Sequence, residues 1–326
     1  MATHPAQGDV SPKAGGRGPG SGHGQSAVRT SRLWRLRHSL FASQLRDFAD
    51  NKVALVASIV FFAIVILALV APVITPQNPH DLTQIDIMDS RLAPGAEGWG
   101  GQTYLLGTDT QGRDMFSAIL YGLRISLFVA VASGAIALTI GLSAGLTAAY
   151  FGGAVDALIM RIVDIQLSFP AILIALVMLA VMGKGVDKVI YALVFVQWAY
   201  YARTIRSAAI TERQKEYLEA AQCLALSHRQ IVFSHLLPNC LPPVIVVATM
   251  QIASAIAIEA TLSFLGLGLP VTQPSLGLLI ANGFSLMMSG DYWVSVFPGV
   301  ALLITIMSVN LMGDQLRDVL NPRNQR

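Results

Sequence analysis

One serine of the sequence stands in a spacing that hydrolases use. Gly141, Ser143 and Gly145 form a Gly-x-Ser-x-Gly motif. In a hydrolase this motif needs a strand-to-helix turn that exposes the serine, and a histidine that takes its proton. Here it lies inside an apolar run, and all six histidines fall outside such runs. We interpret the match as chance, and an inhibitor-probe label on Ser143 would support the alternative of an intramembrane serine protease.

Two acidic residues, Asp164 and Glu259, lie near or within apolar runs, where a charge is costly and usually faces a cavity or a partner. Asp164 has Arg161 three residues before it as a candidate partner. Glu259 either faces a translocation path or a subunit interface, or is a buried, protonated glutamic acid bonded to a neighbouring helix. Two widely separated acids are few for the relay of a stand-alone secondary transporter or channel, which is the second alternative.

Other chemistry is missing from the sequence. The stretch Met182–Gly185 lacks the spacing and the hydroxyl of a nucleotide-binding P-loop. Cys223 and Cys240 are too few for a disulfide scaffold, and no Cys/His spacing indicates zinc. We therefore expect a chain that is not an enzyme and binds no metal or cofactor itself.

Composition indicates that the elements carrying these residues lie in a membrane. Apolar residues make up 54% of the 326 residues and charged residues only 13%. Soluble domains carry roughly 25% charged residues. The net charge of +3 comes with no basic patch, so nucleic acid is excluded as a partner.

The pattern along the chain predicts three regions. Residues 1–31 are expected to be a disordered cytoplasmic tail, residues 32–50 an amphipathic helix on the membrane surface, and residues 51–326 a transmembrane domain. The domain is all-α. Its apolar runs are long enough for six transmembrane helices, at about 53–74, 123–150, 157–182, 189–209, 241–265 and 294–313. Gly134, Gly141 and Gly145 are expected to let helices pack closely.

The distribution of Lys and Arg predicts the orientation. With a cytoplasmic N-terminus, the inner segments hold 17 of the 22 basic residues and the outer segments hold 5. Positive residues concentrate on the cytoplasmic side, so both termini are expected inside. One inner loop, about 210–240, then becomes the most informative segment. It predicts a helix, a tight turn near Ala225–Leu226, and a second helix that Ser227 and Gln230 begin as a capping box.

Within this loop, Glu219-Ala220-Ala221, followed by Ile231, Leu237 and Pro238, resembles the EAA motif of bacterial ABC importer permeases. The resemblance implies a cytoplasmic coupling helix that docks on an ATPase subunit. The family usually has Gly where this chain has Ala225, so we expect a different turn or a longer helix there. The expected coupling residues are Tyr217, Leu218, Glu219, Ala220, Ala221, Leu224, Ala225, Ser227 and Arg229.

Three further segments, 106–127, 260–268 and 310–323, resemble dipeptide, oligopeptide and nickel permeases, most closely the second, C-type permease of the dipeptide pair. The outer stretch 107–114 predicts a turn and a helix start with Asp109 as a candidate cap. Its polar residues either contact the partner permease or binding protein, or fold the outer loop. They are Asp109, Gly112, Arg113 and Asp114.

The resemblance implies a type I ABC importer permease in the cytoplasmic (inner) membrane. Its implied partners are a paralogous permease, two ATPase subunits that carry the ATP and Mg, an extracytoplasmic solute-binding protein and membrane lipid. The implied mechanism is alternating access, with hydrolysis on the ATPase subunits. Dipeptides, longer peptides, glutathione-like compounds, nickel chelates and haem remain open as substrates, and the role of the N-terminal tail is open as well.

Overall fold

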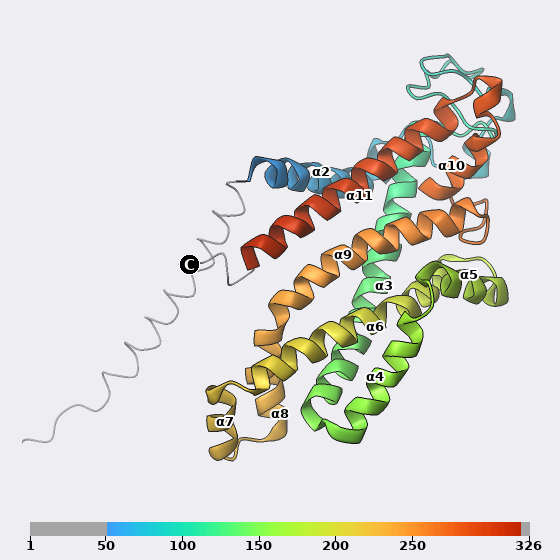
Figure 1. Ribbon diagram of the computed structural model, residues 1–326. Helices are drawn as coiled ribbons and strands as arrows, with labels where there is room; N and C mark the ends of the chain where they lie inside the picture. The colour runs from blue at the N-terminus through green and yellow to red at the C-terminus, as the bar shows by residue number, and fades with distance from the viewer. Residues whose placement is uncertain (1–50, 321–326) are drawn as a thin grey trace, which may run out of the picture. The chain divides into compact units, whose positions relative to one another are not determined.

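The computed structural model describes residues 51–320, so the expected tail at 1–31 and the expected surface helix at 32–50 lie outside the described residues. The described part is helical. Its β structure is limited to two isolated bridges, Glu97 with Thr103 and Thr108 with Asp114, both in the loop after the first helix. This loop and α10 lie at one end of the bundle, and α7 and α8 lie at the other (Figure 1).

Helices account for most of residues 51–320. The long ones are α2 (Lys52–Ile74), α3 (Met115–Phe151), α6 (Val186–Arg213), α9 (Leu237–Phe264) and α11 (Trp293–Leu320). The shorter ones are α4 (Gly153–Leu167), α5 (Ala171–Met182), α7 (Glu216–Cys223), α8 (His228–Gln230) and α10 (Leu276–Phe284). A π-helical stretch, η3 (Ile231–Leu236), joins α8 to α9, and 3₁₀ turns η1 (Leu82–Gln84), η2 (Ile87–Asp89) and η4 (Met287–Ser289) lie in the loops.

Four helices of the described part are long and apolar enough to cross a membrane: α2, α3, α11 and the continuous stretch His228–Phe264. The expected span at 157–182 is instead divided into α4 and α5, which meet at 86°. Pro170 explains the break, because its ring removes a backbone donor and disfavours helical geometry in the residue before it. Counting the bent pair as one span gives five.

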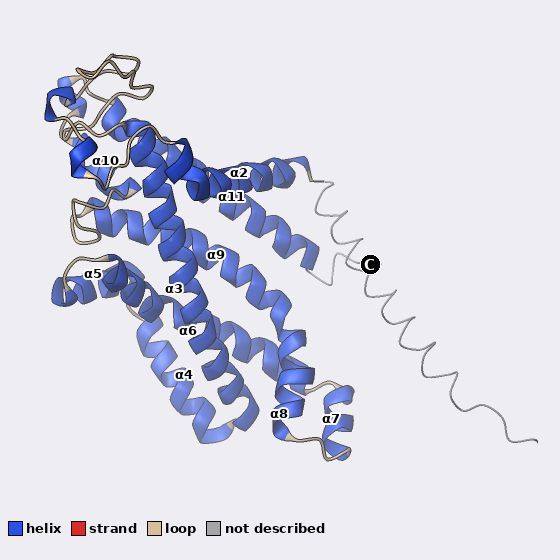
Figure 2. Cartoon of the chain, turned by 180° about the vertical axis from the view of Figure 1, so that it is seen from behind, coloured by secondary structure: helices blue, strands red, loops and turns tan. Residues whose placement is uncertain are grey.

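The helix α6 packs on several neighbours and carries polar residues among its buried positions. It contacts α3, α4, α5 and α9. Figure 2 shows it among these helices from behind. Its inward residues include Gln197, which is 1% exposed, as well as Tyr201 and Ile205. Because of such polar and charged residues, α6 is not among the helices that are apolar enough to cross a membrane by composition. Its other side stays open, since Tyr191 and Phe195 are 55% and 47% exposed.

Glycine lets α3 and α6 approach closely. A Cβ added at Gly141 would lie 2.5 Å from Cβ of Tyr201, and one added at Gly145 would lie 2.6 Å from the carbonyl oxygen of Ala202. The expected close packing at these glycines is therefore confirmed. Between them, the Ser143 hydroxyl donates to the carbonyl of Thr139 at 2.8 Å. The Gly-x-Ser-x-Gly spacing thus serves helix packing within α3, and the strand-to-helix elbow of a hydrolase is not formed there.

The start of α2 and the end of α11 lie side by side. Asn51 caps α2 by accepting hydrogen bonds from the amides of Val53 and Ala54. Its side-chain amide also donates to Gln315 Oε1 at 2.7 Å. The two ends of the described chain are thereby held on the same face of the bundle, as Figure 1 also shows.

Candidate functional site

The helix α7 is anchored at its start by residues from both flanking long helices. Glu212, near the end of α6, accepts from Lys215 Nζ at 2.5 Å and from the Tyr217 hydroxyl at 2.8 Å. Asn239 Nδ2, at the start of α9, donates to the Tyr217 hydroxyl at 3.0 Å. Burial, and then the bond to Glu212, raise the pKa of Tyr217 to about 12. Tyr217 therefore stays neutral near pH 7 and keeps donating to the carboxylate.

One face of α7 is buried and the opposite face is open. Leu218 is 1% exposed and Ala221 5% exposed, and both belong to an apolar cluster with residues of α3, α6, η3 and α9. Glu219 and Ala220 are exposed on the other face. The carboxylate of Glu219 makes no hydrogen bond or ion pair with any side chain of residues 51–320. The helix thus offers a small, acidic surface that its own fold leaves free.

The turn after α7 is left-handed at Ala225, with φ of +52°. The amide of Leu226 donates to the Ala221 carbonyl at 3.3 Å, and the amide of Leu224 donates to that of Ala220 at 3.0 Å. The first of these bonds, with a left-handed residue one position before the donor, forms a Schellman-type helix end. The chain therefore keeps the turn that Gly favours and accepts the steric cost of a Cβ there. The expected change of turn type, or a longer helix, is not found.

The second short helix begins as the sequence predicts. Ser227 is its N-cap, and its hydroxyl accepts from the amide of Gln230 at 3.4 Å. The chain then runs through η3, where the amide of Leu237 reaches back to the carbonyl of Val232. This wider turn ends directly before Pro238, which has no amide hydrogen to donate. Arg229 lies exposed in α8, and Leu224 is 75% exposed in the turn.

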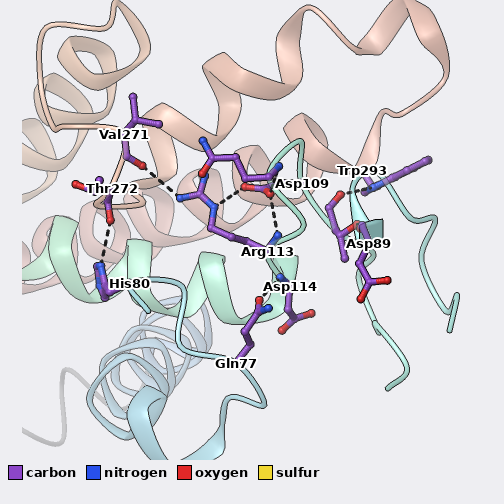
Figure 3. A network of polar contacts seen from close by, with 11 residues as sticks. Gln77, His80, Asp89, Asp109, Arg113, Asp114, Val271, Thr272 and Trp293 are labelled. Atoms are coloured by element: carbon purple, nitrogen blue, oxygen red, sulfur yellow. Dashed lines mark hydrogen bonds and ion pairs between the residues drawn. The ribbon is translucent and has the colours of Figure 1, made fainter. Parts of the chain in front are cut away.

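The residues of the outer segment form a buried polar network instead of an open surface (Figure 3). Asp109 is 0% exposed and Arg113 1% exposed, with 2.7 Å between Asp109 Oδ2 and Arg113 Nε. The other carboxylate oxygen of Asp109 accepts from the amides of Gln111 and Arg113. Gly112, in this turn, has φ of +80°. Asp109 is therefore not the helix cap that the sequence suggested, because it closes the turn instead. The cap of α3 is Asp114, which accepts a hydrogen bond from the amide of Ser117 at 2.9 Å.

This network joins three outer segments that are far apart in the sequence. Gln77 accepts from the amide of Asp114 at 2.6 Å, and Arg113 donates to the Val271 carbonyl at 3.4 Å. Trp293, at the start of α11, donates from its ring to the Thr108 carbonyl at 3.2 Å. The geometry supports a fold-stabilising role for Asp109, Gly112, Arg113 and Asp114. A partner could reach only the surface that these residues support.

Glu259 lies inside the chain between α9 and α3. It is fully buried; its carboxylate accepts from Ser126 at 2.6 Å and from Ser263 at 2.8 Å. This geometry agrees with the interpretation of a buried carboxyl bonded to a neighbouring helix. Asp164, in contrast, differs from expectation, because its ion pair is with Arg203 of α6 and not with Arg161.

Several residues that shape these sites escaped the sequence analysis. Glu212 and Asn239 hold Tyr217, and Gln77 and Trp293 hold the outer network. Nothing in the local sequence marks Gln77 or Trp293, since their partners lie 37 and 185 residues away. The ion pair of Glu212 could have been predicted, because Glu212 and Lys215 are three residues apart. No group of three or more potential metal ligands occurs among residues 51–320.

Comparison with known proteins gives this arrangement a family. Residues 137–326 match the model of the binding-protein-dependent transport system inner membrane component, and residues 39–94 match the N-terminal TM domain of oligopeptide transport permease C. The chain belongs to this family of inner membrane transport components. It is thus a multi-pass permease subunit that works with a binding protein and an ATPase, and is not an enzyme. The expected resemblance to C-type permeases is confirmed.

Two relatives are similar in sequence to most of this chain. The di/tripeptide transport system permease protein DppC of Pseudomonas aeruginosa is 36% identical over 279 residues, covering 85% of this chain and 90% of the relative. The dipeptide transport system permease protein DppC of Bacillus subtilis is 32% identical over 281 residues, covering 86% and 85%.

Among solved structures, a chain of the inward-facing MetNI methionine ABC transporter superposes with a TM-score of 0.52 at 22% identity. The match covers 64% of this chain and 98% of that one. The similarity shows a shared fold, that of an ABC importer permease.

Proposed function

We propose that this permease is the C-type subunit of an ATP-driven importer for short peptides. The substrate class rests on relatives, since the proteins from Pseudomonas aeruginosa and Bacillus subtilis that it resembles over about 85% of its length are di/tripeptide and dipeptide permeases. In such systems an external binding protein is expected to select the peptide and present it.

The observation that carries the mechanism is the two-sided character of α7. Its inner face is held by the apolar cluster and by the Tyr217 contacts to α6 and α9, whereas Glu219 and Ala220 face outward. A helix fixed in this way moves together with the long helices behind it. We assign it as the coupling helix, with the small Ala220 permitting close approach by an ATPase subunit.

The proposed topology has six spans with both termini in the cytoplasm. The four apolar helices, the bent α4–α5 pair and α6 would supply the six. The Asn51–Gln315 contact supports an even number, because it holds the first and last spans at the same face. The excess of Lys and Arg in the segments on that side favours the cytoplasm.

In the proposed cycle this chain pairs with a paralogous permease. A loaded binding protein docks on the outer loops and releases peptide into a cavity between the two permeases. Closure of two ATPase subunits around ATP and Mg shifts both coupling helices and changes the side to which the cavity opens. ATP hydrolysis then resets the permeases.

The test is purification of the tagged chain from native membranes in mild detergent, followed by reconstitution of the recovered complex. We expect a second permease and ATPase subunits to copurify, and the vesicles to take up a labelled dipeptide only with ATP and the loaded binding protein. Uptake without ATP by vesicles holding this chain alone would indicate a secondary transporter. Uptake of another solute class, with peptides inactive, would contradict the substrate and leave the importer mechanism standing.

A further inference from the structure

An apolar groove lies at the α7 end of the bundle, between the last turns of α3 and the α8–η3 segment. Its volume is about 290 Å³. The walls include Leu142 and Leu146 from α3 and Val232 and Phe233 from η3. Phe151 and Phe233 are 71% and 63% exposed, so the groove opens at the protein surface.

The hydroxyl groups along this groove are already bonded within the chain. Ser143 donates to the Thr139 carbonyl at 2.8 Å and Thr147 to the Ser143 carbonyl at 2.7 Å. The Tyr150 hydroxyl is bonded to Nδ1 of His228. A polar ligand would therefore find few free hydroxyl partners along the walls, whereas a hydrocarbon chain would displace none of these hydrogen bonds.

The mouth of the groove is basic. Arg229 lines it, is exposed, and has no ion pair with an acidic side chain of residues 51–320. The guanidinium of Arg213 lies 5.9 Å from the centre of the Tyr150 ring, which forms part of the wall. No Asp or Glu of the described residues lines the groove. The charge thus complements an anionic group at the end of an apolar ligand.

The position along α3 matches the depth of lipid headgroups. At 37 residues and 1.5 Å per residue, α3 is about 55 Å long, whereas the hydrocarbon layer is about 30 Å thick. The first residues of α3 are tied into the outer network, and the groove occupies its opposite end. Because α3 exceeds this layer by about 25 Å, its last turns, which carry the groove walls, reach the edge of the hydrocarbon layer or pass beyond it.

We propose that the groove binds an anionic phospholipid, with one acyl chain between α3 and η3 and the phosphate at Arg229. Such a lipid would tie the end of α3 to the segment that follows α7. The inference needs only that the chain spans a membrane, and it does not depend on the peptide substrate.

The test is native mass spectrometry of the purified complex after delipidation and titration with phosphatidylglycerol or phosphatidylcholine. We expect phosphatidylglycerol to bind and phosphatidylcholine to bind much more weakly. Arg229→Gln should weaken phosphatidylglycerol binding about fivefold. Thr147→Trp fills the groove from an exposed position, and Ser143→Phe is a second filling variant, so both should remove binding.

The matched control is Arg161→Gln, which removes an exposed basic residue of α4 outside the groove and should leave binding unchanged. Each variant must remain monodisperse and helical. Equal binding of the two lipids would overturn the proposal. So would retention of phosphatidylglycerol by both filling variants, or its absence from an intact complex whose partner subunit covers the groove.

Discussion

The two polar motifs of this permease use their charged residues in opposite ways. In the outer segment, Asp109 and Arg113 point at each other inside the fold, at 0% and 1% exposure. In α7, Glu219 faces outward and its carboxylate has no partner among the described residues. Burial separates the two motifs: the outer motif is enclosed by the fold, whereas the α7 motif leaves its acidic residue exposed.

The largest effect is expected from breaking the outer pair. Arg113→Met leaves Asp109 buried without its counter-charge, which should cost roughly 3–5 kcal/mol of stability. Thermal unfolding of the purified chain, followed by its intrinsic fluorescence, measures the loss. The control Arg91→Met breaks a pair whose arginine side chain is 54% exposed, with 3.7 Å between Arg91 and Asp291, and should change stability by about 1 kcal/mol or less. Equal losses in the two variants would refute the structural role.

A second variant should destabilise the same outer segment by straining its backbone. Gly112→Ala places a Cβ 2.0 Å from the carbonyl oxygen of Asp86 at a residue with φ of +80°. The left-handed conformation alone costs about 1–2 kcal/mol for a non-glycine residue, so we expect a loss of about 2 kcal/mol or more. Folded yield and unfolding temperature are the measurements. Gly100→Ala, with nothing within 4 Å of its added Cβ, should behave as the parent chain.

A change in the exposed α7 motif should leave stability unchanged and lower activity instead. Glu219→Lys should leave the unfolding temperature unchanged, because the carboxylate makes no internal contact. Reversing a charge at an interface costs about 2 kcal/mol or more, so binding-protein-stimulated ATPase activity should fall at least about tenfold. Asp314→Lys, a charge reversal at an exposed acid of α11 outside α7 and the outer loops, is the control. Normal stimulated activity in Glu219→Lys would count against α7 as the coupling helix.

The smallest expected effect is a gain in stability at the end of α7. Ala225→Gly removes the Cβ from a residue with φ of +52°. Relief of the left-handed conformation outweighs the greater freedom of Gly in the unfolded chain, so the helix end should become about 0.5–1 kcal/mol more stable. Slower hydrogen exchange at the amides of Leu224 and Leu226, which close the turn, would show it. Faster exchange would mean that the turn is held by contacts that the Cβ makes.

Local patterns carried the sequence analysis and long-range contacts limited it. The Ser227 cap and the position of the turn near Ala225 could be predicted because their partners lie within five residues, whereas the left-handed conformation of Ala225 was not expected. The burial of Arg113 could not, since it depends on packing against the loop of Val271, 158 residues away. The break between α4 and α5 was visible in Pro170, but hydropathy alone reads the two helices as one span.

The arginines of α6 have a consequence for how the protein is made. Arg203 and Arg206 lie toward the Arg213 end of this helix; since an arginine costs up to about 2.5–3.5 kcal/mol at the centre of a span, they make α6 less suited to enter the bilayer by itself. Asp164 and Asp156 of α4, synthesised earlier, pair with these arginines. Insertion of α6 should therefore depend on α4 already being in place. In a glycosylation-mapping assay, replacing both aspartates with leucine should leave a larger fraction of chains with α6 outside the membrane.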